Sequence, residues 1–190
     1  MKHYRLFLIL VVVLCASLTA WSQKSDVLTL SGGYVFANIE DYDTSATGWR
    51  INLLYESNPK GAPLAHGAAI GYISTSAKGG LTGTGGQQAE YTISTLPIYY
   101  APKYMFGAEN FKAFVKGAVG LQVSWLSRTG GVAEISTNDF GFYGGAGAGV
   151  MLMLGEEMFV NAEYEWAYLS NSYYKDGFLN SVMAGIGFRL

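Results

Sequence analysis

The sequence contains one cysteine, four prolines and two histidines in 190 residues, and only 14% of its residues are charged. A single cysteine excludes an internal disulfide framework and any metal site built from several thiolates. The formal net charge of −2, without a basic patch, argues against nucleic-acid binding, which needs cations to neutralise phosphates. The low charge together with an aromatic content of 15% excludes intrinsic disorder.

The first 22 residues have the layout of a secretory signal peptide. Lys2 and Arg5 precede an apolar run from Leu6 to Leu14, and small residues follow. This run is about half of the ~20 apolar residues that a transmembrane helix needs. The segment Ala20-Trp21-Ser22 fits cleavage before residue 23, and cleavage after residue 20 is the alternative. We therefore predict a signal peptide at 1–22 and an exported domain at 23–190.

Beyond residue 26 the sequence alternates with a period of two, which is typical of strands with two different faces. In residues 113–125 every odd position is apolar, whereas even positions are mostly polar or small. Similar alternation indicates eight strands of roughly 10–15 residues. Breaks rich in turn-forming residues separate them, near 39–47, 57–63, 77–88, 105–111, 127–138, 155–157 and 169–177. Pro97 predicts a bulge or a weakly paired point in the less regular segment 89–103.

The capacity of an eight-stranded barrel decides which face points outward. Its interior is just wide enough for side chains to fill. The apolar face carries large rings such as Trp49, Phe142 and Trp166, whereas Gly, Ala, Ser and Asn dominate the other face. We therefore predict the all-β class and an eight-stranded antiparallel up-and-down transmembrane β-barrel, with its bulky face toward lipid. A soluble exported barrel resembling a lipocalin is the alternative.

Aromatic residues on the bulky face are expected to form girdles at the two membrane interfaces. If the first strand runs outward, the tryptophans fall toward the extracellular rim, while Tyr55, Tyr99 and Phe188 fall toward the periplasmic rim. The predicted girdle consists chiefly of Trp49, Trp125, Trp166, Tyr168, Tyr55 and Phe188.

Polar residues converge on the opposite, lumen-facing side. Charges in a narrow interior must be paired, because isolated burial costs free energy. The predicted lumen network consists of Arg50, Asn52, Glu56, Lys116, Gln122, Asn161, Glu163, Glu165 and Arg189. We interpret it as a plug, since eight strands leave little free bore. A narrow porin for small solutes is the alternative.

The carboxyl-terminal segment Gly185-Ile186-Gly187-Phe188-Arg189-Leu190 resembles the terminal strand signal of outer-membrane barrels. Together with Leu96-Pro97-Ile98-Tyr99-Tyr100 and the glycine-rich strands, it resembles the small outer membrane protein beta-barrel domain family. That family is related in architecture to the membrane domain of outer membrane protein A. The resemblance covers 26–190 and implies the outer membrane of a diderm bacterium, with lipids around the barrel. It also implies that the barrel-insertion machinery recognises the last strand.

No arrangement of residues in the sequence indicates catalysis, a metal site or a cofactor. His66 is the single histidine after residue 22, and it is placed near a periplasmic turn, where a structural role is expected. Asp41 and Asp43 are expected to be solvated loop acids. We predict a structural or cell-surface interaction role rather than an enzyme. Tyr173 and Tyr174, in a loop whose residues 171–176 should be dispensable for folding, are candidates for contacting an unknown extracellular ligand.

Overall fold

The computed structural model of the chain describes residues 26–39, 45–58, 62–80, 88–129, 135–171 and 173–190. The predicted signal peptide, Asp41 and Asp43 lie outside these residues. The strands are β1 (Asp26–Ile39), β2 (Ser45–Ser57), β3 (Leu64–Gly80), β4 (Gln88–Tyr100), β5 (Lys103–Gly107), β6 (Phe111–Thr129), β7 (Ile135–Met153), β8 (Met158–Leu169) and β9 (Tyr174–Arg189). In the part of the chain that the structure describes, no helix is long and apolar enough to span a membrane.

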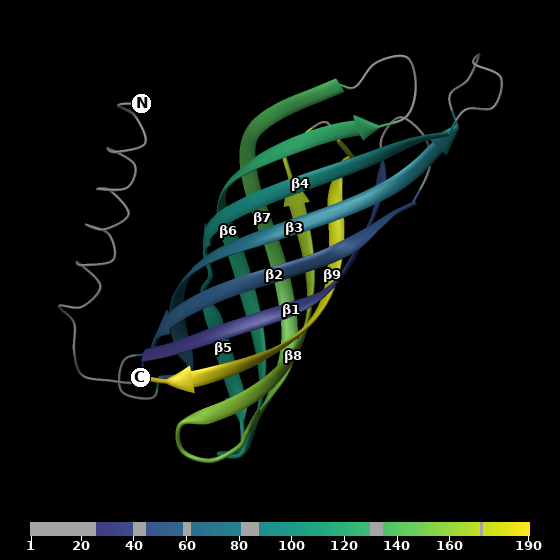
Figure 1. Cartoon of the computed structure of the whole chain (residues 1–190). Coiled ribbons are helices and arrows are strands. Elements are labelled where there is room, and N and C mark those ends of the chain that lie inside the picture. Colours follow the sequence, from purple (N-terminus) through teal and green to yellow (C-terminus); the bar gives the residue numbers. More distant parts are fainter. Residues whose placement is uncertain (1–25, 40–44, 59–61, 81–87, 130–134, 172) are drawn as a thin grey trace.

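The strands form one closed antiparallel barrel (Figure 1). Each strand pairs with the next along the chain, except that β4 and β5 do not pair with each other and both pair with β3 and β6. β1 also pairs with β9, which closes the ring. Closure brings the end of the chain beside its first strand, where the Leu190 amide donates to the Asp26 carbonyl at 2.8 Å. We call this end of the barrel the inner end. The opposite end, at which β1 is followed by β2, β3 by β4, β6 by β7 and β8 by β9, is the outer end.

The nine strand segments make eight barrel strands, because β4 and β5 are two halves of one. Both halves lie between β3 and β6 and pair with each of them. Ala101 and Pro102 separate the halves, yet the Ala101 amide donates to the Gly67 carbonyl at 2.8 Å, and the Pro102 carbonyl accepts from Gly117 at 2.9 Å. The predicted eight-stranded barrel is confirmed, whereas the prediction of one uninterrupted strand over 89–103 is wrong at this point.

Pro97 sits where the β3–β4 ladder is interrupted. Its pairing with Gln122 of β6 is kept. On the β3 side the paired residues are Ile70 with Ile98 and then Ile73 with Thr95, with a gap between them. A proline has no backbone N–H to donate, which accounts for a gap on one side only.

Several strands are longer than the alternation predicts. β6 and β7 have 19 residues each and enter the predicted break at 127–138 from both sides. There, polar residues pair as regularly as apolar ones do, for example Ser127 with Ser136. Backbone hydrogen bonds do not require apolar side chains, so the ladder continues where the apolar pattern stops.

The bulky apolar side chains point outward, as predicted. Leu30, Val119 and Leu121 are 52%, 48% and 53% exposed, whereas their strand neighbours Ser31, Ala118 and Gln122 are buried. Such a continuous apolar exterior is stable only in contact with hydrocarbon. The soluble barrel is therefore excluded, because a soluble protein would not expose so many large apolar groups on its exterior.

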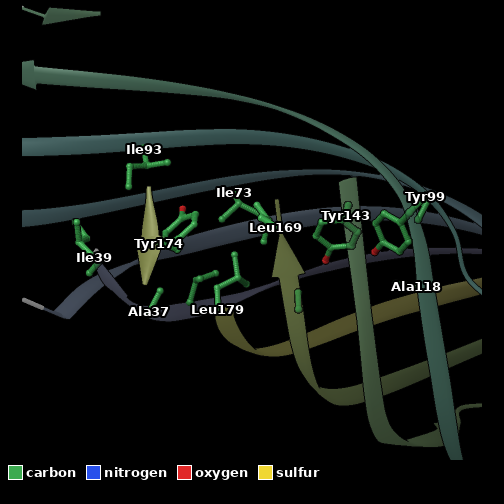
Figure 2. Packing of buried hydrophobic residues seen from close by; sticks show 14 of the residues in the cluster. Ala37, Ile39, Ile73, Ile93, Tyr99, Ala118, Tyr143, Leu169, Tyr174 and Leu179 are labelled. Atoms are coloured by element: carbon green, nitrogen blue, oxygen red, sulfur yellow. The ribbon is translucent and has the colours of Figure 1, made fainter. Parts of the chain in front are cut away.

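Apolar side chains also fill the outer half of the interior, which the sequence pattern did not predict. Ile73, Ile93, Leu169 and Leu179 are at most 1% exposed, and Tyr174 lies among them. Figure 2 shows these residues leading inward to Tyr143 and Tyr99. We call the group of Ile39, Ile73, Ile93, Leu169, Tyr174 and Leu179 the apolar layer.

Candidate functional site

Arg50 lies at the centre of a buried polar network in the middle of the lumen. Its Nη1 donates to Glu165 Oε1 at 2.6 Å, and its Nη2 donates to the Tyr99 hydroxyl at 3.0 Å. The Tyr143 hydroxyl also donates to Glu165 Oε1. Lys116 Nζ lies 2.8 Å from the other oxygen, Glu165 Oε2. One carboxylate thereby joins two cations and a phenol from β2, β6 and β7.

The same network extends to two further predicted residues. Lys116 forms a second ion pair with Glu163, and the Tyr99 hydroxyl donates to Asn52 Oδ1 at 2.9 Å. The Arg50 guanidinium lies 5.9 Å from the Tyr99 ring centroid and 5.8 Å from that of Tyr143. These distances are within the range of cation–π attraction, which holds the guanidinium beside both rings.

A second ion pair lies toward the inner end. Lys103 Nζ donates to Glu56 Oε2 at 2.6 Å and lies 4.8 Å from the Phe114 ring centroid. Sequence reasoning placed Glu56 in the lumen but missed Lys103, because Ala101 and Pro102 obscure the alternation. Alternate residues of a strand share a face, so Lys103 points inward together with the buried Tyr99 and Ala101.

The ionised side chains of the two ion-pair clusters balance in sign. Among the described residues, the cations are Arg50, Lys103 and Lys116, and the anions are Glu56, Glu163 and Glu165. All six are at most 7% exposed. Buried pairs contribute little net stability, but removal of one partner leaves an uncompensated charge. Each side chain therefore depends on its partner for its place in the lumen.

The other predicted lumen residues are divided between three places. Gln122 belongs to a separate cluster, in which Ser124 Oγ accepts from Asn171 Nδ2 at 3.0 Å and donates to Gln122 Oε1. Asn161 is buried on the inward face of β8. Arg189 is not in the network: its side chain is exposed and donates to the Glu156 carbonyl at 3.1 Å. Arg189 lies outside the lumen because β9 ends at this residue, so that its side chain extends beyond the rim of the barrel.

Some buried polar atoms have no protein partner in the described part of the chain. Thr29 Oγ1, Asn161 Oδ1 and Ser181 Oγ belong to the adjacent strands β1, β8 and β9. Buried polar groups require a hydrogen bond, and water supplies one where protein does not. This side of the lumen therefore has a place for ordered water.

The predicted girdle residues all lie on the outward face. Trp49 contacts Tyr72 with ring centroids 5.4 Å apart, and Trp166 stacks on Phe178 at 4.6 Å. Tyr168 contacts the same Phe178 at 5.4 Å, and Trp125 is exposed on β6.

Toward the inner end, the girdle residues are Tyr55 and Phe188. The Tyr55 hydroxyl donates to Asp26 Oδ2 at 2.8 Å, and Phe188 is 42% exposed. Tyr99 was predicted beside them, but it is 3% exposed and points into the lumen, because it shares its strand face with Ala101 and Lys103.

The two candidate loop tyrosines have different environments. Tyr174 is 1% exposed, and its hydroxyl lies 2.9 Å from Thr75 Oγ1, so it belongs to the apolar layer and not to a contact surface. Tyr173 is partly exposed and packs on the same layer. Partial burial, followed by the charge of Asp139, raises the pKa of Tyr173. Both effects favour the protonated form of the phenol.

Among the residues that the structure describes, His66 and the acidic side chains form no recognisable catalytic or metal site. His66 Nδ1 lies 2.5 Å from the Tyr100 hydroxyl, and the two rings stack on the outward face. Within the described ranges, no group of three or more His, Cys, Asp or Glu side chains is placed to hold a metal ion.

A closed antiparallel barrel with an apolar exterior and buried ion pairs in its lumen defines an integral outer-membrane barrel. The model of the family described as outer membrane protein beta-barrel domain matches residues 7–189, and the chain belongs to this family. The protein is therefore located in the bacterial outer membrane. No curated protein sequence matches the chain.

Solved structures share the fold at low sequence identity. Neisserial surface protein A is 14% identical with a TM-score of 0.62, covering 87% of this chain and 97% of that one. Ail, the attachment invasion locus protein of Yersinia pestis, is 16% identical with a TM-score of 0.55, covering 88% and 100%. A major outer membrane protein from Thermus thermophilus is 11% identical with a TM-score of 0.56, covering 88% and 100%.

Proposed function

We propose that this protein is a sealed outer-membrane barrel with a structural or cell-surface interaction role, and that it is not an enzyme. The observation that carries the proposal is the filling of the lumen by two successive layers. The apolar layer occupies the outer half, and the network around Arg50 and Glu165 occupies the middle. Ions would have to cross a segment filled mainly by buried apolar side chains and then break buried ion pairs, and both steps cost free energy.

Single-channel recording in planar bilayers tests the seal. We expect no stepwise conductance from the wild-type barrel. Lys116→Ala and Glu163→Ala should lower stability without opening a channel, because the apolar layer is left intact. A large conductance in the wild type would show that the bore is open. A conductance that appears only in these variants would show that the polar network alone closes the barrel.

A narrow porin is the second candidate, and one observation favours it. Thr29, Asn161 and Ser181 present buried polar atoms without a protein partner along adjacent strands, which suits a file of water molecules. This file must still end at the apolar layer unless that layer moves. Solute uptake into proteoliposomes distinguishes the candidates, since a sealed barrel admits neither ions nor small neutral solutes.

A surface role requires side chains at the outer end that a partner can reach. Tyr173 is the better candidate of the two tyrosines, because it is partly exposed while Asn171 ties the neighbouring backbone to Ser124. Deletion of 171–176 would remove Tyr174 from the apolar layer, so it would not separate folding from contact. Neisserial surface protein A and Ail, whose names describe surface and attachment proteins, share this fold.

A single substitution gives a sharper test of the surface role. Tyr173→Ala should reduce adhesion of cells that display the protein to host-cell monolayers, without changing the amount of folded barrel. Tyr104→Ala, an exposed tyrosine at the inner end, is the matched control and should have no effect on adhesion. Equal adhesion by wild type and Tyr173→Ala would remove this residue from the proposed contact surface.

A further inference from the structure

A hollow of about 350 Å³ opens at the outer end of the barrel, where β1, β2 and β9 meet. Its walls combine aromatic, amide and charged side chains within a small area. The residues that matter for its chemistry are Phe36, Asn38, Lys175, Asp176, Phe178 and Asn180. This combination differs from the mainly apolar exterior nearer the middle of the barrel.

A backbone irregularity in β9 creates the hollow. The β1–β9 register breaks between the pair Ala37 and Leu179 and the pair Ile39 and Tyr174, so residues 175–178 have no partner in β1, while Phe178 stays paired with Tyr168 of β8. Asp176 has a φ of 54° and Gly177 a φ of 73°. A positive φ is uncommon for a residue other than glycine, and such conformations cluster at ligand sites.

The hollow faces the membrane interface and not the lumen. Phe36 and Asn38 lie on the outward face of β1, alternating with the buried Ala37 and Ile39. Phe178, which also lines the hollow, stacks on the girdle residue Trp166. Aromatic girdles mark the level of the lipid headgroups. A ligand therefore reaches this hollow sideways, from the outer leaflet of the membrane.

We propose that this hollow binds the headgroup of an outer-leaflet glycolipid that carries sugar hydroxyls and phosphate. The Lys175 ammonium supplies a charge-assisted hydrogen bond to phosphate. The Asp176 carboxylate accepts from sugar hydroxyls, and the Asn38 and Asn180 amides donate to them and accept from them. The Tyr164 hydroxyl donates to Asn180 Oδ1 at 2.5 Å, which orients that amide.

A second feature on the same two strands fits the acyl chain of such a lipid. A shallow apolar groove of about 470 Å³ lies between β1 and β9, where Gly32 pairs with Ala184 between larger neighbours, among them Leu30 and Ile186. Six residues along β1 separate Asn38 from Gly32, which is ~20 Å at ~3.3 Å per residue. On a strand tilted by about 45° this is a depth of ~14 Å, within one leaflet of a hydrocarbon core ~30 Å thick.

Native mass spectrometry of the full-length mature barrel in detergent micelles tests the proposal. The probe is lipid A, a phosphorylated glucosamine disaccharide with acyl chains. We expect one lipid A to be retained per barrel, and the combined variant Asn38→Leu and Lys175→Ala to weaken retention about tenfold or more. Asn138→Leu, at an exposed residue near the outer end of β7, is the matched control and should bind like the wild type.

Two further probes separate the possible sources of the headgroup chemistry. Phosphatidylglycerol has phosphate and acyl chains but no sugar, and free glucosamine phosphate has no acyl chain. Both should bind at least about tenfold more weakly than lipid A. The proposal would be overturned if phosphatidylglycerol bound as tightly as lipid A, or if free glucosamine phosphate saturated the site at the same concentration. It would also be overturned if the combined variant retained lipid A unchanged while still folded, as shown by heat-modifiable migration. The outcome is independent of whether the lumen conducts.

Discussion

At the scale of single residues, glycines on the inward face make room for aromatic rings. A Cβ atom added to Gly187 would lie 2.0 Å from Cζ of Phe159, and one added to Gly149 would lie 2.5 Å from Cζ of Phe114. Both phenylalanines are 1% exposed. Their rings lie against the bare backbone of a neighbouring strand, so the glycines are needed because of a close approach and not because of a turn.

Gly187→Ala should therefore destabilise the barrel by about 1–3 kcal/mol, the usual cost of overpacking. Urea unfolding in lipid vesicles measures this difference. Gly32→Ala is the control, because an added Cβ there meets only the Arg50 carbonyl at 3.5 Å. Adding Phe159→Leu to Gly187→Ala should restore part of the loss. No difference between the Gly187 and Gly32 variants would show that the ring can move aside freely.

Lys116 tests the dependence of the buried charges on one another. Lys116→Met should cost about 3–5 kcal/mol of unfolding free energy, because Glu163 and Glu165 lose a shared cation. Adding Glu163→Gln should reduce this loss, since one of the stranded charges is then neutral. If the double variant is less stable than the single one, repulsion between stranded carboxylates is not the cause of the loss.

The inward face was only partly predictable from the residues. Period two alone placed Arg50, Lys116 and Glu165 inside, because alternation fixes a side chain's face without knowledge of its neighbours. It did not pair Lys103 with Glu56, since that pairing depends on strand register across a break. It also gave Arg189 an inward position that the end of the strand does not support.

At the scale of elements, depth along a strand sets the cost of a substitution on the outward face. Val119 is near the middle of β6, and Ser127 is near its outer end on the same face. Val119→Arg should cost roughly 2–4 kcal/mol, and Ser127→Arg about 0–1 kcal/mol. Refolding into vesicles and denaturant titration measure both. Equal costs would mean that Val119 does not face the hydrocarbon core.

The last strand has a proposed role in assembly, before the barrel is folded. We propose that the insertion machinery reads β9, in which Phe188 is exposed on the outward face. Phe188→Ala should then slow assembly by purified insertion machinery, measured as the rate at which heat-modifiable barrel appears. Spontaneous refolding of the same variant into thin vesicles is the control and should change less. Equal slowing of both reactions would indicate a general folding defect.

Strand ends and interruptions were the least predictable elements. Alternation stops where a strand leaves the hydrocarbon, yet β6 and β7 continue as paired polar strands. Proline gave the correct signal at Pro97, where the ladder with β3 is interrupted. At Pro102 the same residue type interrupts a strand and separates β4 from β5. The barrel stays closed there, because Gly67 of β3 and Gly117 of β6 still form backbone hydrogen bonds with Ala101 and Pro102.

At the scale of the whole molecule, the fold followed from a volume argument and the filling of the lumen did not. Eight strands can enclose only a few of the large rings, so the face that carries most of them must point outward. The apolar layer arises because inward residues such as Ile73, Leu169 and Leu179 come from distant parts of the chain and meet only when the barrel closes. No local pattern in the sequence records that meeting.

The cancellation of charge in the lumen has a consequence for the protein in its cell. A voltage across a membrane acts on the net charge of a group that lies within it. The described ion pairs join three cations to three anions, so that voltage exerts no net pull on them. A voltage across the outer membrane therefore does not pull this group of six side chains as a unit toward either side of the membrane.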